Sequence, residues 1–138
     1  MRRTGLSFFS IAALVLALGA GTGGIASAKP LAQQRSSDQG VTIKVKPVDV
    51  APTAAAWSFE LVLDTHSGDL SDDLARSVTL HGGGKQALPT AWQGDAPGGH
   101  HRKGILRFEP IHPVPESIEL RMQRPGEKGP RSFRWRLK

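Results

Sequence analysis

The sequence predicts an all-β protein, an immunoglobulin-like antiparallel sandwich of about seven strands. Apolar and polar residues alternate with a period of two in several short segments, which is the pattern of half-buried strands. The 16 glycines and 10 prolines among the 138 residues supply the many turns that such strands need. No segment beyond residue 28 keeps a helical period. A small open β-barrel is the alternative architecture.

The first 28 residues predict an export signal. Arg2 and Arg3 precede the apolar run 8–20, and Ala26-Ser27-Ala28 supplies a small-residue cleavage site. The apolar run is shorter than the ~20 residues of a spanning helix. We therefore expect a mature protein that begins at Lys29 and works in the periplasm or outside the cell. Residues 29–40 are polar and without periodicity, so they predict a disordered linker.

Residues 41–138 predict the sandwich domain, in which strand-like segments follow one another. In chain order these segments are 41–46, 57–64, 77–81, 104–108, 117–122 and 132–137. Residues 70–78, between two of them, have room for a single helical turn. The chain has no cysteine, so no disulfide can join the two sheets. Aromatic packing is expected to hold them together, through Trp57, Phe59, Phe108, Phe133 and Trp135.

The last two segments predict a hairpin across residues 124–130 with a basic outward face. Alternation places on that face Glu119, Arg121, Gln123, Arg134, Arg136 and Lys138. The whole chain carries a formal charge of +6, and loss of Arg2 and Arg3 with the signal leaves +4. Arg121, Arg134, Arg136 and Lys138 are therefore candidates for binding an anionic envelope polymer or a protein partner. Protection of an edge strand is the alternative role for these cations, and nucleic acid is not expected as a partner.

Two histidine-bearing segments predict a transition-metal site. They are Asp64-Thr65-His66-Ser67 and Pro97-Gly98-Gly99-His100-His101-Arg102. If both turns lie at one end of the sandwich, His66, His100 and His101 can converge on copper or zinc, with Asp64 orienting an imidazole. Adjacent histidines on a regular strand face opposite ways, so the glycines must make this loop irregular. In the alternative reading the histidines only hold their loops through hydrogen bonds to neighbouring backbone.

The sequence predicts no catalytic activity. It has neither a G-x-S-x-G nucleophile turn nor a P-loop, and Asp64, His66 and Ser67 are too close along one strand end to form a hydrolytic triad. The acidic stretch 69–73 departs from the spacing of an EF-hand loop. We therefore expect a binding or structural protein.

With these motifs in view, the chain resembles a poorly characterised family of small exported bacterial and archaeal β proteins. The resemblance rests on LVLDTHS with SDDLA downstream, on Trp92 followed by GGHHRKGILRF, and on the closing IEL and RSFRWRL segments. It covers most of the chain from Val41 onward. It implies the extent of the domain and singles out the same histidine segments, without adding a mechanism. The closing turn RPGEKGP is longer than the short glycine turn that the family implies.

Overall fold

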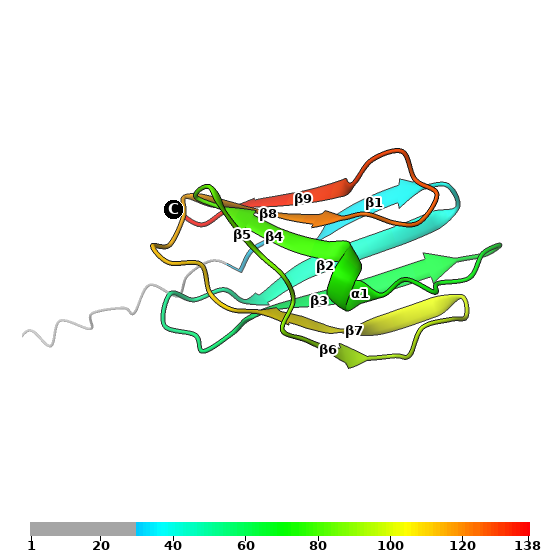
Figure 1. The fold of residues 1–138 in the computed structure, drawn as a ribbon, viewed down its shortest axis with the longest axis horizontal. Helices are drawn as coiled ribbons and strands as arrows, with labels where there is room; N and C mark the ends of the chain where they lie inside the picture. The colour runs from blue at the N-terminus through cyan, green and yellow to red at the C-terminus, as the bar shows by residue number, and fades with distance from the viewer. Residues whose placement is uncertain (1–29) are drawn as a thin grey trace, which may run out of the picture.

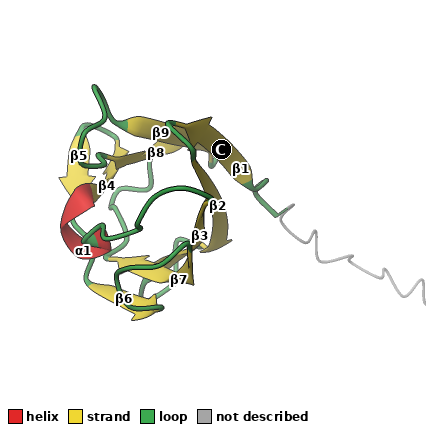
Figure 2. Ribbon diagram, turned by 90° about the vertical axis from the view of Figure 1, so that its right-hand side faces the viewer, coloured by secondary structure: helices red, strands yellow, loops and turns green. Residues whose placement is uncertain are grey.

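Two antiparallel sheets packed face to face make up the described part of the protein, residues 30–138 of a computed structural model (Figures 1 and 2). The predicted signal, residues 1–28, lies outside these described residues. One sheet has the order β1-β2-β3-β7-β6, with bounds Gln34–Asp38, Val41–Asp49, Trp57–Thr65, His101–Phe108 and Ala91–Gly94. The other has the order β5-β4-β8-β9, with bounds Lys85–Ala87, Val78–Gly82, Ser117–Met122 and Arg131–Arg136. The predicted antiparallel sandwich is confirmed, with nine strands among the described residues.

The N-terminal strand β1 corrects the predicted linker. Residues 34–38 pair with β2 along their whole length, so the linker 29–40 is wrong over this stretch. The turn between the two strands is tight, with positive φ at Gln39 (47°) and Gly40 (75°). β1 has almost no apolar side chain to bury. Its position therefore depends on backbone pairing and on polar contacts. Neither produces an alternation of apolar residues, so the sequence pattern does not predict this strand.

The inward face of each strand fills one core between the sheets. Phe59 on β3 contacts Phe108 edge to face at 5.7 Å within its own sheet. It also lies 5.8 Å from Trp135 on β9, ring centre to ring centre, and so joins the two sheets. All five aromatic residues predicted to hold the core are buried, which confirms that expectation.

Both lateral openings of the sandwich are covered (Figure 2). On one side β1 lies beside β9, where the indole nitrogen of Trp135 donates to the carbonyl of Ala32 at 2.7 Å. On the other side the single helical turn α1, Leu74–Ser77, contacts β4 and β6. Asp73 caps this turn by accepting from Ala75 N at 3.2 Å. Residues 70–78 thus hold one helical turn, as predicted.

An arginine–carboxylate network ties three parts of the chain together at one end. Arg124 binds Asp72 through two hydrogen bonds of 2.9 and 3.1 Å, and also contacts Glu127 at 3.3 Å. Glu127 in turn binds Arg131, which donates to the carbonyls of the β1–β2 hairpin at Ser36, Asp38 and Val41. Burial opposes the charge of Arg124, but Asp72 and Glu127 outweigh it and raise the pKa of that guanidinium. The network therefore holds the N-terminal hairpin against the β8–β9 turn.

Among residues 30–138, no helix has the length and apolar content needed to cross a membrane.

Candidate functional site

The two histidine segments do lie at the same end of the sandwich. The β3–β7 ladder places Asp64 opposite His101, and just beyond it Thr65 N donates to the carbonyl of His100 at 2.9 Å. The loop is irregular at Gly98 and Gly99, where φ is 111° and 76°. Both features agree with the predicted geometry of the backbone. Carbonyl and amide contacts between the GGHH loop and residues 65–70 hold the two turns together.

The side chains at this end form a pair rather than a triad. His101 Nδ1 lies 2.5 Å from Asp64 Oδ1, and both side chains are about half exposed. His66 and His100 are exposed on the flanking turns. Asp69 accepts from Gly99 N at 2.7 Å and so holds the loop itself. Within residues 30–138, no three His, Asp or Glu side chains are grouped as a metal ion would need.

Arg102, next to this pair, was not singled out from the sequence. It is 1% exposed and lies on the inward face of β7, below the ring of Trp92 at 5.6 Å. Its guanidinium donates to the carbonyls of Leu70 at 3.1 Å and Asp72 at 2.7 Å. Arg102 lies four residues before the buried Leu106 on the same strand. The two-residue alternation of a strand would therefore have placed the Arg102 side chain on the inward face. Arg102 therefore attaches the segment before α1 to the sheet.

The outward face of β8 and β9 carries the predicted basic patch. The inward residues of the hairpin are buried as expected, which leaves Arg121, Arg134 and Arg136 exposed on one side. Register places Glu119 of β8 directly between His81 of β4 and Arg134 of β9. His81 Nε2 lies 2.9 Å from the hydroxyl of Thr79.

Glu119 is the centre of this face. Its Oε1 accepts from Arg121 Nε at 2.5 Å and from Ser132 Oγ at 3.0 Å, and its Oε2 accepts from Arg134 Nε at 2.9 Å. The bond from Arg121 contributes most, and with those from Ser132 and Arg134 it outweighs partial burial and lowers the pKa of Glu119 to about 2. The carboxylate therefore stays charged at any pH above this value.

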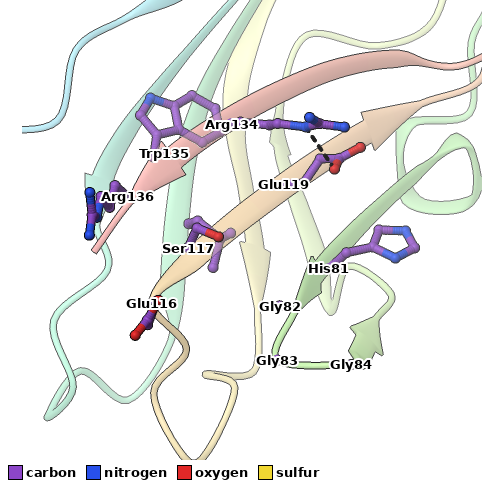
Figure 3. A pocket seen from close by; sticks show the side chains of 11 residues that line it. His81, Gly82, Gly83, Gly84, Glu116, Ser117, Glu119, Arg134, Trp135 and Arg136 are labelled. Atoms are coloured by element: carbon purple, nitrogen blue, oxygen red, sulfur yellow. Dashed lines mark hydrogen bonds and ion pairs between the residues drawn. The ribbon is translucent and has the colours of Figure 1, made fainter. Parts of the chain in front are cut away.

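A cavity of about 570 Å³ opens over the end of this face (Figure 3). It is lined by the Gly82–Gly84 turn, by Glu116 and Ser117 before and at the start of β8, and by His81, Ile118, Glu119, Arg134, Trp135 and Arg136. Gly82 is required at its floor, since a Cβ there would lie 2.8 Å from Pro115 Cγ. The cavity offers both hydrogen-bond donors and carboxylate acceptors to a ligand.

A second hollow, of about 420 Å³, lies among the end of β2, the segment that follows it, and the residues before β1 and after β9. Apolar side chains dominate its lining, among them Leu31, Val48, Val50, Val114 and Leu137. Its titratable lining residues are Asp49 and Lys138.

Comparisons of this chain with protein-family models, with curated proteins and with solved structures give no match.

Proposed function

We propose that this protein is an exported, non-catalytic binding module whose outward β8–β9 face contacts an anionic polymer or an acidic partner of the cell envelope. The observation that carries this proposal is the shared orientation of Arg121, Arg134 and Arg136 beside a cavity. Side chains on alternate residues of paired strands form one continuous surface, so a long polyanion can contact all of them at once.

The charge balance of the face supports an anionic ligand. Glu119 pairs with two arginines, so the group of three keeps one net positive charge. Arg136 forms no ion pair with an Asp or Glu side chain of residues 30–138, and Lys138 lies two residues further on. Glu116, at the rim, is the opposing carboxylate. The surplus of cations is modest, which favours binding that is sensitive to salt.

The test is retention on an immobilised polyanion as a function of salt. Replacing Arg134 and Arg136 by serine should lower the salt concentration at which the protein elutes. The matched control replaces Lys44 and Lys46 by serine, which removes the same charge from β2 on the other sheet. If both double variants elute at the same lowered salt concentration, net charge alone explains the effect. If the arginine variant elutes as the parent does, this face is not the binding surface.

A second candidate function, copper or zinc binding, is favoured by the Asp64–His101 pair. In a histidine that binds metal through one ring nitrogen, the other ring N–H usually donates a hydrogen bond to a carboxylate. His101 Nδ1 has such a partner in Asp64, so its Nε2 is the nitrogen left to bind metal. His66 and His100 lie on the adjoining turns, and their exposed side chains are free to rotate toward the ion. The proposed ligands are therefore His66, His100 and His101.

Metal titration tests this second candidate. Copper or zinc should bind at about pH 7.5 and be released near pH 5, because imidazole protonates around pKa ~6.5. His101→Ala should abolish binding, and Asp64→Asn should weaken it. His112→Ala is the control, since His112 lies outside the GGHH loop. Binding that survives His101→Ala together with His100→Ala would exclude this site.

A further inference from the structure

The three arginines of the β8–β9 face share one mode of attachment. Arg121 and Arg134 each bind Glu119 through Nε, and Arg136 binds the carbonyl of Lys138 through Nε at 2.8 Å. Within residues 30–138, the terminal nitrogens of these three side chains donate no hydrogen bond. Each guanidinium is therefore anchored at one nitrogen, while its two amino groups remain available to a ligand.

The structural arginines of the same protein behave differently. Arg102, Arg124 and Arg131 are buried and use their terminal nitrogens on partners inside the fold. Their amino groups are thus already occupied. These six arginines therefore form two groups, one that holds the fold together and one that presents free donors on the β8–β9 face.

Anchoring through Nε matters because an arginine side chain is long and flexible. A free surface arginine loses rotamer freedom when it binds a ligand, and this loss weakens the binding. An arginine already held at Nε has lost part of that freedom before the ligand arrives. Figure 3 shows Arg134 extended along the sheet, with its Nε beside Glu119 and its terminal amino groups at the far end.

We propose that Glu119 is a positioning residue that holds Arg121 and Arg134 so that their amino groups receive the oxyanions of an acidic polymer. This inference rests on the proposed function and specifies its ligand chemistry: carboxylate or phosphate groups repeated along a flexible chain, which match the paired donors of a guanidinium. Glu119 itself does not contact the ligand, because its carboxylate repels an oxyanion and is turned toward Arg121, Ser132 and Arg134.

Glu119→Gln separates positioning from simple charge attraction. The variant adds one positive charge to the face, so charge attraction alone predicts tighter binding to a polyanion. Positioning predicts the opposite, a loss of about fivefold, because glutamine keeps a single acceptor oxygen for two arginines. Glu116→Gln is the matched control. It makes the same charge change at the rim of the same cavity, and the Glu116 side chain accepts no hydrogen bond from these arginines.

The experiment measures the affinity of the full chain, with and without its signal, for polygalacturonate and for polyphosphate by titration calorimetry. The two polymers distinguish a carboxylate source from a phosphate source. Weaker binding by Glu119→Gln together with unchanged or tighter binding by Glu116→Gln supports the inference. Thermal melts of both variants verify the fold, and Glu119→Asp, which keeps both oxygens, should recover part of the loss.

Failure of this inference and failure of the proposed function give different results. If Glu119→Gln tightens binding as Glu116→Gln does, while serine at Arg134 and Arg136 still weakens it, positioning is overturned and the binding face stands. If the serine variant binds both polymers as the parent does, or the parent binds neither, the face is not a polyanion site and both ideas fall.

Discussion

The side-chain amide of Gln34 binds both backbone polar groups of Arg134, although 100 residues separate the two in the chain. Arg134 N donates to Gln34 Oε1 at 3.0 Å, and Gln34 Nε2 donates to the carbonyl of Arg134. These are groups that another strand would otherwise use on the outer edge of β9. A single amide therefore occupies the middle of this edge and holds β1 beside it.

Gln34→Ala should expose the β9 edge to pairing between molecules. We expect a loss of about 1 kcal/mol in the free energy of unfolding and self-association that grows with concentration. Light scattering after size exclusion measures the association. Gln33→Ala, one residue earlier and exposed, is the control and should stay unchanged. A Gln34 variant that stays dispersed would show that β1 covers the edge without this amide.

Asp72→Asn should be the most damaging single change in the arginine network. It removes the closer of the two carboxylates that bind Arg124 and leaves Glu127 at 3.3 Å, so the loss should approach but not exceed the cost of breaking a buried ion pair, about 3–5 kcal/mol. Asp73→Asn is the matched control. Its side chain is 61% exposed, and asparagine also serves as a helix cap, so urea unfolding should detect almost no change there. Equal stability of the two variants would contradict the structural role of the network.

Gly104→Ala should destabilise the protein, because β6 and β7 approach closely where Gly104 pairs with Gly94. A Cβ at residue 104 would lie 2.6 Å from Gln93 O and 2.7 Å from Trp92 Cη2. Overpacking of this kind costs about 1–3 kcal/mol. Gly129→Ala, which meets no atom within 4 Å, should be neutral. Thermal unfolding compares the two, and an unaffected Gly104 variant would mean that the edge strand β6 shifts freely.

Acid should weaken the fold through Glu119 and Glu127. Arg121 lowers the pKa of Glu119 to about 2, and Arg131 lowers the pKa of Glu127, from an ordinary value of 4.5. A carboxylate with a lowered folded-state pKa stabilises the protein above its ordinary pKa, and this contribution is lost as the pH falls through the folded-state value. Urea unfolding should show a decline between pH 4.5 and about 2. In Glu119→Gln that decline should be smaller, and an identical profile would contradict the assignment.

The strands that sequence analysis placed correctly are those with one buried face. Val41, Ile43 and Val45 in β2, and Leu61 and Leu63 in β3, keep the period of two that burial imposes. The strands β1, β5 and β6 were missed because they are short and mostly exposed. These three strands place few side chains in the core, so their sequences carry no such period.

The candidate sites were likewise predictable only where their residues lie on regular strands. Alternation was enough to place Arg121 and Arg134 on the outward face, because the period of two fixes the face of every strand residue. It could only suggest that Glu119 reduces the charge there. Both arginines donate to Glu119 through Nε. This contact depends on side-chain rotamers, which the spacing of residues in the sequence does not specify. For His66 and His100 the chain leaves the regular strand, so alternation predicts no direction for their side chains.

The contacts between β1 and β9 also determine when the sandwich can be completed during folding. The indole nitrogen of Trp135 donates to the carbonyl of Ala32, 103 residues away in the chain. Arg131 donates to the carbonyl of Ser36, 95 residues away. Contacts of such wide sequence separation form slowly, because a long loop must close first. Because synthesis runs from the N-terminus, β1 can pair with β2 early, but its side of the sandwich stays open until residues 131–135 of β9 have been synthesised.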